Sequence, residues 1–314
     1  MRVLVVTSLY PTAEHPERGR FVKDQVDALR ALGADLELFT FEPGARNYAR
    51  AARELRRRHR GERFDVVHAH HGLSGWTARA LGRRPLVVTF HGTDLEHPVV
   101  GPLSRALAHA ADLPAAVSGA LARARLAGAG RTRRVGVLPC GIDLGRFRPL
   151  DRAEARRELG LDPGGRYLLF PADPGRPEKR HDRAAELAAD AGAQLLAYRH
   201  TAPERAPLYV NAAAAVLVTS EREGFGLAVL EALACDVPVL ATGVGIAPLA
   251  LAGIEGTLCG QFEPDRWSPL LERHLATPDP RVSGRARAAL FGRDHMAARV
   301  FRAYGDLVPA IRAV

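Results

Sequence analysis

The sequence predicts an α/β protein built from two doubly wound domains in tandem. Short apolar runs rich in β-branched residues, such as Arg2–Thr7, alternate with longer stretches whose apolar residues recur at helical spacing. The alternation restarts after residues 148–151, a proline-containing stretch typical of a connection between domains. The chain has 314 residues, which is long enough for two domains of ordinary size.

The first half begins with a βαβ unit. A continuous apolar strand over 2–7 precedes a helix over 21–32, which Gly33 ends, and a second strand over 35–41. This order predicts a parallel sheet with helices on its faces. The pattern continues with helices over 47–59, 73–81, 103–110 and up to Ala127, and with strands over 64–68, 86–90, 113–118 and 135–138.

The second half repeats the alternation. Asp151 is placed to cap a helix over 152–159. Strands over 167–170 and 194–197 and at the run that ends at Val218 then alternate with helices over 181–191 and 207–215. A helix that starts near Gly226, strands over 237–241 and 256–259, and helices over 267–275 and 295–314 follow.

These elements define the predicted domains. Residues 1–149 form a first Rossmann-like domain, 150–295 form a second, and 296–314 form a C-terminal helix that packs back on the first. Two such domains facing each other across a cleft would hold a ligand between the carboxyl ends of their strands.

Composition indicates a globular protein, with 47% hydrophobic and 25% charged residues. No apolar run approaches the roughly 20 residues of a membrane span, and the N-terminal stretch is too short for a signal peptide, which predicts a cytoplasmic protein. Cys140, Cys235 and Cys259 have no metal-ligand spacing, so we expect reduced, structural thiols.

The formal charge of +9 comes almost wholly from arginine, because Lys23 and Lys179 are the only lysines. No zinc finger, aromatic-interleaved basic run or nucleic-acid module is evident, so nucleic acid is not an expected partner. An acidic substrate such as a nucleotide phosphate accounts for the charge equally well.

The most informative stretch is SEREGFGLAVLEALACDVPVLAT, residues 220–242. It predicts a strand end, a glycine loop, a helix and a strand, with Glu223 in the loop and Glu231 in an otherwise apolar helix. A helix that starts near Gly226 would direct free N–H groups at an anion, and a carboxylate among apolar residues needs a partner. A ligand with phosphate and hydroxyl groups fits; the alternative is that Glu231 faces solvent and the glycines only form a turn.

Histidines gather at two strand ends of the first domain. His91 follows the strand LVVTF, and the expected ligand edge of an α/β fold lies there, so we interpret it as a substrate contact rather than a structural loop histidine. His68, His70 and His71 end the preceding strand. They suggest a metal site as an alternative, but no acidic ligand at a typical spacing accompanies them.

Two further loops carry basic or glycine residues at expected anion positions. Arg176 and Lys179 lie in FPADPGRPEKRH after a strand, where they would meet phosphate oxygens; a solvated basic loop is the alternative. Gly19 lies in the first strand-to-helix loop, without a GxGxxG motif.

Residues 46–63 carry eight arginines on a predicted helix. The helix could rest on an anionic membrane surface and so bring a lipid-linked acceptor within reach. A solvated helix face is the alternative, because the apolar side of the helix is mostly alanine.

Several motifs together resemble the GT-B glycosyltransferases of family GT4. They are GRFVKDQVDALRALGADLEL, FDVVHAHHG, VVTFHGTD, VLPCGIDLGRFRP, RPEK and EGFGLAVLEALACDVPVLAT, which span nearly the whole chain. The last contains the E-x7-E pattern of the family as Glu223 and Glu231. The family more often separates its arginine and lysine by five positions, as in GRLxPEK, whereas Arg176 and Lys179 are three apart. The abbreviated segment before Pro207 is similar to a branch associated with cell-surface polysaccharide and teichuronic-type synthesis.

The resemblance implies a role for each site residue. Glu231 would bind the ribose of the donor nucleotide and Glu223 the donor sugar. Lys179 and Arg176 would neutralise the diphosphate, and His91 would lie beside the reacting sugar. Sugar and phosphate oxygens would meet the backbone N–H groups of Phe225, Gly226 and Leu227, with Gly19 near the phosphate.

The predicted function is therefore retaining transfer of a sugar from a nucleoside diphosphate sugar to an acceptor hydroxyl, with neither metal nor cofactor. The acceptor would be a small molecule, a glycan or a lipid-linked group, and residues 46–63 would give peripheral contact with the inner face of the membrane. The alternatives are a GT-B sugar-nucleotide epimerase and a nucleotide-sugar-binding protein without catalysis. The sequence does not name the sugar, the base, the acceptor or the oligomeric state.

Overall fold

The computed structural model of the chain describes residues 1–82, 85–131, 134–198 and 201–312. The chain divides into two units. Unit 1 consists of residues 1–141 with the C-terminal segment from Arg293, and unit 2 consists of residues 142–292. The sequence pattern places the corresponding boundaries at 149 and 295.

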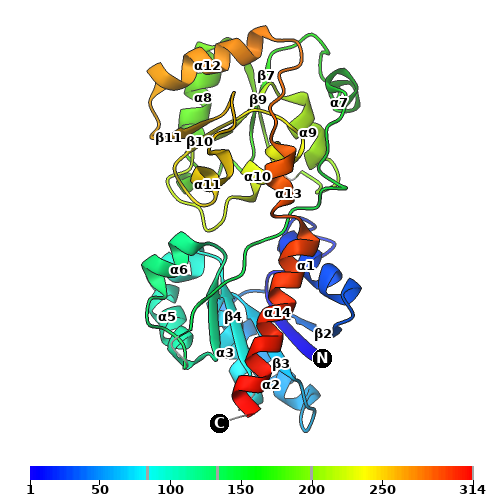
Figure 1. Cartoon of the computed structure of the whole chain (residues 1–314), viewed down its shortest axis with the longest axis vertical. Helices are drawn as coiled ribbons and strands as arrows, with labels where there is room; N and C mark the ends of the chain where they lie inside the picture. Colours follow the sequence, from blue (N-terminus) through cyan, green and yellow to red (C-terminus); the bar gives the residue numbers. More distant parts are fainter. Residues whose placement is uncertain (83–84, 132–133, 199–200, 313–314) are drawn as a thin grey trace. The chain divides into compact units, whose positions relative to one another are not determined.

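Unit 1 is built on a six-stranded parallel sheet with the strand order β2-β1-β3-β4-β5-β6 (Figure 1). Thr7 pairs with His70, and His70 pairs with Thr89, so β1, β3 and β4 end at one edge of the sheet. The strands are β1 (Arg2–Thr7), β2 (Asp35–Thr40), β3 (Val66–His70), β4 (Leu86–Phe90), β5 (Leu113–Ala116) and β6 (Gly136–Val137).

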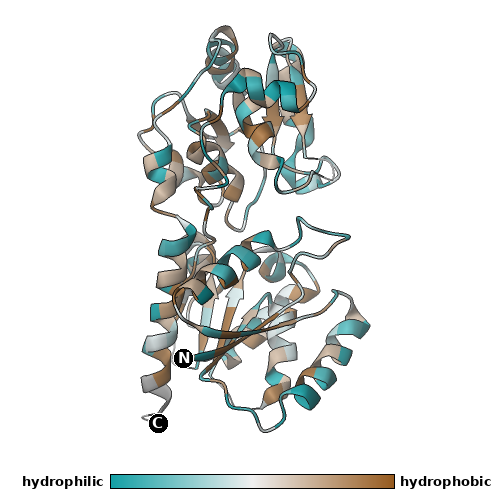
Figure 2. Ribbon diagram, turned by 90° about the vertical axis from the view of Figure 1, so that its right-hand side faces the viewer, coloured by the Kyte–Doolittle hydropathy of each residue, from teal (hydrophilic) through white to brown (hydrophobic). Residues whose placement is uncertain are grey.

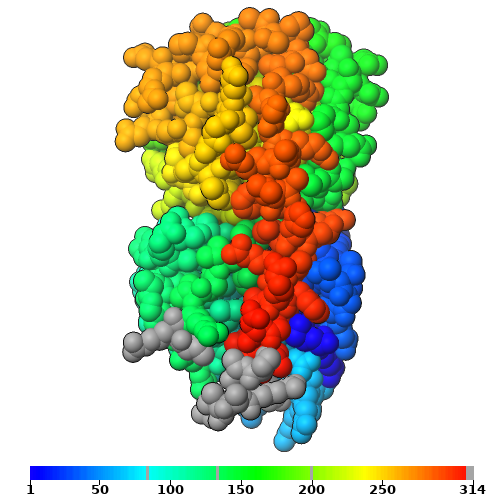
Figure 3. Space-filling model, in the orientation of Figure 1, coloured from blue at the N-terminus to red at the C-terminus, as the bar shows by residue number. Residues whose placement is uncertain are grey.

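The helices of unit 1 include one from the far end of the chain. α14 packs on α1 and buries Val300 and Tyr304 in the same core as Val22 and Val26; it lies at the surface of unit 1 in Figure 3. The helices are α1 (Arg20–Ala31), α2 (Ala45–Arg58), α3 (Gly72–Ala78), the 3-10 helix η1 (Arg79–Leu81), α4 (Thr93–Glu96), α5 (Val100–Ala110), α6 (Gly119–Arg125) and α14 (Arg293–Arg312).

Unit 2 has a five-stranded parallel sheet with the order β11-β10-β9-β7-β8 and a core that includes Phe170, Leu240 and Trp267. Its strands are β7 (Tyr167–Phe170), β8 (Gln194–Ala197), β9 (Ala215–Val218), β10 (Val239–Thr242) and β11 (Leu258–Gly260). Its helices are α7 (Arg152–Glu158), η2 (Pro177–Lys179), α8 (His181–Asp190), α9 (Ala206–Ala212), α10 (Leu227–Ala234), α11 (Ala247–Leu251), α12 (Pro264–Ala276) and α13 (Arg285–Ala289).

The predicted α/β class with two Rossmann-like domains is confirmed. Strands β1, β3 and β4 are buried on both faces, as expected for parallel strands covered by helices on either side, and Figure 2 shows hydrophobic residues concentrated along the strands. The predicted cap of α7 is also confirmed, because the Asp151 side chain accepts a hydrogen bond of 2.8 Å from Glu154 N. No helix within the described ranges combines the length and the apolar character needed to cross a membrane.

Candidate active site

The loop between β9 and α10 presents backbone donors at the carboxyl edge of the sheet in unit 2. Gly226 caps α10 with φ of 90°, a conformation that glycine adopts without strain. The buried Phe225 ring packs edge-on against Phe291, with 6.2 Å between ring centroids. The N–H groups of Phe225, Gly226 and Leu227 donate no hydrogen bond to another described residue. They therefore remain available to an anion, as the sequence predicts.

Lys179, from the segment between β7 and α8, contacts Glu223 of this loop although the two residues are far apart in the sequence. Lys179 Nζ lies 2.5 Å from Glu223 Oε1, and Ser220 Oγ donates to the same oxygen at 2.8 Å. Both side chains are largely buried, with 13% and 12% of their areas exposed. Thr219 Oγ1 donates to the Lys179 carbonyl at 3.1 Å and so ties the lysine loop to the end of β9. The structure therefore brings a cation and a carboxylate together beside the start of α10.

Arg176 lies with Lys179 in the segment between β7 and α8, but its guanidinium does not point toward Glu223. Its Nε and Nη2 atoms donate to Glu178 Oε1 at 2.9 and 2.6 Å, and about half of the side chain is exposed. The guanidinium thus pairs with Glu178 and not with Glu223, and its predicted role at the diphosphate stays a prediction.

Glu231 occupies the helix predicted for it and is half-buried there. Its carboxylate lies near Tyr198, which follows β8; burial, and next the Glu231 charge, raise the pKa of Tyr198 well above its usual value. The Tyr198 ring meets Tyr209 edge-on at 6.0 Å between centroids. Glu231 therefore lies near the segment that leaves β8, and its role as a ribose contact stays a prediction.

Gly245 supports the loop around Glu223 and was not among the residues predicted from the sequence. It has φ of 58°, and a Cβ atom there would lie 2.4 Å from the Phe225 carbonyl oxygen and 2.8 Å from Glu223 Cβ. The next residue, Ile246, donates its N–H to the same carbonyl at 2.7 Å. A glycine three residues beyond the end of β10 was the available signal for this close approach.

The histidines of unit 1 form a connected row at the ends of β3 and β4. His70 Nδ1 lies 3.2 Å from His91 Nε2, and the His70 and His68 rings are 4.3 Å apart. His68 is held by Thr89 Oγ1 at 2.8 Å from its Nε2 and by the Tyr304 hydroxyl at 2.5 Å from its Nδ1. The rings of His68, His70 and His91 thus lie together, at the edge where the sequence predicts a ligand.

These histidines are uncharged near neutral pH. Burial lowers the pKa of His68 to about 3 and lowers the pKa of His70 and of His91 well below the ordinary value. A charge on another ring of the row lowers each pKa further: His91 acts on His68, His68 on His70, and His70 on His91, because two positive rings repel. The row therefore acts as a set of neutral hydrogen-bonding groups.

Asp94 fixes the backbone around His91. Its Oδ1 accepts from the N–H groups of His91 and Gly92, and its Oδ2 accepts from Gly72 N, all at 3.0 Å. Burial of this fully enclosed carboxyl raises its pKa, while His71 and the three N–H groups act in the opposite direction. Asp94 ties the loop after β4 to the start of α3, and the position of an acid three residues after His91 was the signal for it in the sequence.

Gly19 is required by its surroundings. It caps α1 with φ of 62°, and a Cβ atom there would lie 2.3 Å from the carbonyl carbon and oxygen of Leu9. Only glycine fits so close to the backbone. Its predicted position near a phosphate stays a prediction.

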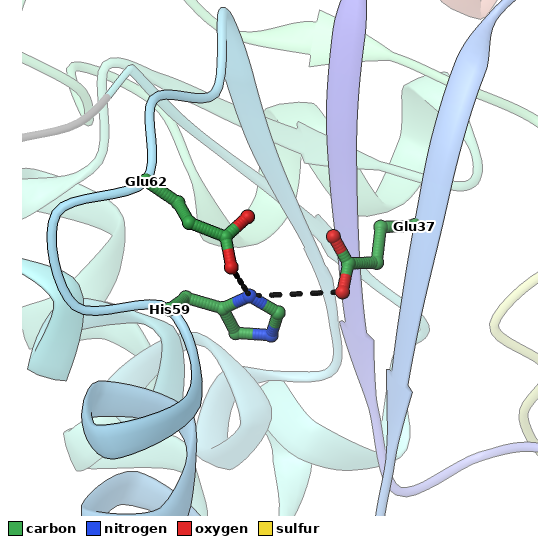
Figure 4. Close-up of side chains that lie close together, drawn as sticks. All are labelled: Glu37, His59 and Glu62. Carbon is green, nitrogen blue, oxygen red and sulfur yellow. Dashed lines mark hydrogen bonds and ion pairs between the residues drawn. The ribbon is translucent and has the colours of Figure 1, made fainter.

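Figure 4 shows a separate group of metal-ligand side chains, formed by Glu37, His59 and Glu62. It is the one such group in the part of the chain that the structure describes, and the predicted alternative at His68, His70 and His71 does not form one. Arg2 contacts both carboxylates, at 2.5 Å to Glu62 and 3.4 Å to Glu37. Because the guanidinium supplies the positive charge there, this group is an ion-pair network between β1, β2 and the end of α2.

Sequence and structure comparisons place the chain among known proteins. Residues 2–146 match the family model of Glycosyltransferase Family 4, and residues 152–289 match that of Glycosyl transferases group 1. The chain is 32% identical to the D-inositol 3-phosphate glycosyltransferase of Frankia alni, over 80% of this chain and 76% of the relative. It is also 32% identical to the enzyme of the same name from Segniliparus rotundus, over 75% of this chain and 64% of the relative.

Solved structures share the fold at lower identity. Sucrose-phosphate synthase from Thermosynechococcus elongatus has a TM-score of 0.78 at 20% identity, over 98% of this chain and 99% of the other. Anabaena HepE in complex with UDP and glucose has a TM-score of 0.70 at 16% identity, over 97% and 99%. The two family models and the curated relatives show that the chain belongs to glycosyltransferase family 4, as an enzyme with the GT-B fold.

Proposed function

We propose that this glycosyltransferase moves a sugar from a nucleoside diphosphate sugar to an acceptor hydroxyl with retention of configuration and without a metal ion. The observation that carries the proposal is the contact of Lys179 with Glu223 beside the open N–H groups at the start of α10. The HepE structures contain UDP or UDP-glucose, and the curated relatives are named for D-inositol 3-phosphate. They support a uridine nucleotide donor and a hydroxylated, phosphorylated acceptor.

In this mechanism the donor separates the Lys179–Glu223 pair. The diphosphate oxygens bind the ammonium group and the N–H groups of Phe225, Gly226 and Leu227, and Glu223 accepts from hydroxyls of the sugar. The bond between the sugar carbon and the phosphate oxygen breaks, and the acceptor oxygen bonds to the same carbon on the same face. The acceptor proton passes to the departing diphosphate, so configuration is retained and neither carboxylate serves as a glycosidase-type acid or base.

Transfer to a defined acceptor tests this function. Purified full-length protein is incubated with UDP, GDP, ADP and dTDP sugars, with and without inositol 3-phosphate, in the presence of EDTA. We expect nucleotide release that depends on the acceptor and, by NMR, a glycoside with the anomeric configuration of the donor. An inverted product, or activity that EDTA abolishes, would refute the mechanism, and donor converted to an epimer without acceptor would favour the epimerase instead.

Glu231→Gln is expected to weaken donor binding by roughly 10- to 100-fold, because hydrogen bonds to an ionised carboxylate contribute about 1.5–3 kcal/mol. The turnover of bound donor should change only a few-fold. Calorimetric titration with the preferred nucleotide sugar and initial-rate kinetics separate the two effects. Glu272→Gln, at an exposed glutamate of α12, serves as the control. A larger loss in kcat than in affinity would contradict the assignment of Glu231 to the ribose.

The proposal includes docking of unit 1 on an anionic membrane surface through α2. The eight arginines of residues 46–63 are all exposed. The neighbouring helix α3, which lies between α2 and α5, carries Trp76, and α5 carries Leu103, with 40% and 49% of these residues exposed. Trp76 Nε1 donates to the Leu103 carbonyl at 3.0 Å. An exposed tryptophan next to a basic helix is typical of the interface of a lipid bilayer.

Sedimentation with lipid vesicles tests this docking. The double substitution Arg56→Gln and Arg57→Gln should weaken binding to vesicles that contain acidic phospholipid by roughly 30-fold, because each arginine contributes about 1 kcal/mol. The same change at the exposed Arg157 and Arg273 of unit 2 should have little effect. Equal losses in both variants, or equal binding to neutral vesicles, would show that α2 is only a solvated face.

A further inference from the structure

We propose that His70 is a positioning residue that sets the tautomer of His91, so that His91 presents an Nδ1–H group as a hydrogen-bond donor to the bound ligand. The proposal deepens the proposed function and rests on it for the role of His91 beside the reacting sugar. The proposal concerns which of the two nitrogens of the neutral His91 ring carries the proton. The contact with His70 determines this.

The two rings share a single proton at their contact. His70 Nδ1 and His91 Nε2 are 3.2 Å apart, a hydrogen-bond distance at which one nitrogen must donate and the other accept. Because burial keeps both rings neutral, a pair of donors is excluded there. The tautomers of His70 and His91 are therefore coupled: if His70 carries its proton on Nδ1, His91 carries its own on Nδ1 as well.

The second nitrogen of His70 decides between the two arrangements. His70 is 2% exposed, and its Nε2 is buried without a hydrogen-bond partner among the described residues. If His91 donated, His70 would hold its proton on Nε2 as a buried N–H group without an acceptor, which is rare in proteins. If His70 donates from Nδ1, its Nε2 is a buried acceptor without a hydrogen bond, and buried acceptors without a partner are more common in proteins than buried N–H groups without one. The second arrangement is favoured.

The second nitrogen of His91 remains open. His91 Nδ1 has no partner among the described residues and is not among their buried, unpartnered atoms, which leaves it accessible on a half-buried ring. The ring lies 4.8 Å from the Phe21 ring, and Asp94 holds the backbone N–H of His91. In the favoured arrangement this open nitrogen bears a hydrogen, so it donates to a ligand oxygen and cannot take the proton of an acceptor hydroxyl.

His70 can perform this role because it is itself held in place. Its ring stacks near His68, which is bonded on both nitrogens, to Thr89 and to Tyr304 of α14. The direction of the His91 donor thus depends on the row formed by His68, His70 and His91. The row identifies His70 as a residue that acts through His91 and not by touching the ligand.

Nitrogen-15 NMR of the full chain with labelled histidine tests the tautomer directly. We expect His91 to show a protonated Nδ1 and an unprotonated Nε2 at pH 7.5. In His70→Asn the side-chain amide can replace the Nδ1–H donor, and the His91 signals should remain. In His70→Leu the donor is lost, and His91 should shift toward the tautomer protonated on Nε2.

Kinetics supply the second measurement. His70→Leu should lower kcat roughly tenfold with little change in the KM for the donor, the size expected when one hydrogen bond at the reacting sugar is lost, and His70→Asn should retain most of the activity. A His91 ring protonated on Nε2 in the wild-type protein would overturn the proposal. So would a Leu variant with unchanged His91 signals and kcat, or an Asn variant no better than a folded Leu variant. If the wild-type protein transfers no sugar, the proposed function fails, while the NMR spectra still decide the tautomer.

Discussion

Lys179→Ala is expected to lower kcat by about a hundredfold or more, since the loss of a positioned group that stabilises developing charge typically has this effect. The ammonium group lies at the start of α10 and is 2.5 Å from the carboxylate that would bind the sugar. The variant therefore loses the charge that would offset the departing diphosphate. It also leaves Glu223 with Ser220 alone as its hydrogen-bond donor among the described residues.

The other lysine of the chain provides the matched control. Lys23 pairs with Asp27 along α1, with 2.5 Å between Nζ and Oδ2, and it is more exposed than Lys179. Lys23→Ala removes the same charge, and turnover should stay within about twofold, the range expected for an exposed ion pair. Initial rates at saturating donor and acceptor give both values. A Lys179→Ala enzyme with near-normal turnover would rule out the proposed mechanism.

Asp94→Ala is expected to lower the free energy of unfolding of unit 1 by about 2–5 kcal/mol. The substitution leaves three backbone N–H groups without their acceptor, and each buried unsatisfied group costs about 1–3 kcal/mol, less where water can enter. Asp94→Asn should be milder. Its amide oxygen can still accept from His91 and Gly92, and only the bond from Gly72 is lost.

The two tryptophans allow unit 1 to be followed alone. Trp76 belongs to unit 1 and the buried Trp267 to unit 2, so fluorescence in a Trp267→Phe background reports the urea unfolding of unit 1. The Ala variant should have a lower midpoint than the Asn variant, which in turn should lie below the parent. A loss smaller than about 1 kcal/mol for Ala, or equal losses for both variants, would show that Asp94 does not hold these loops together.

Local sequence patterns predicted most of the fold, because in longer strands and helices the apolar residues recur at a recognisable spacing. The strands 2–7, 86–90 and 167–170 have the predicted bounds. The short helices α4, α11 and α13 were missed, since four or five residues are too few to establish a helical repeat.

The sequence placed Lys179 and Glu223 at strand ends, and parallel topology then brings such ends to one edge of a sheet. It could not give the direction of Arg176, because the choice between Glu178 and a ligand is made by side-chain rotamers. Gly245 and Asp94 were missed for a different reason. Each has a signal in the spacing of its own loop, but the contacts of Gly245 with Phe225 and of Asp94 with Gly72 join separate loops, and no local spacing encodes them.

The return of α14 to unit 1 determines the order in which the chain can fold during synthesis. Tyr304 bonds a histidine 236 residues earlier, and its helix completes the core around Val22 and Val26. Every residue of unit 2 is synthesised before that helix, and at about 5–20 residues per second the synthesis of unit 2 takes roughly 8–30 s. During that time the histidine row of unit 1 lacks Tyr304, and the core around Val22 and Val26 lacks the helix that covers it.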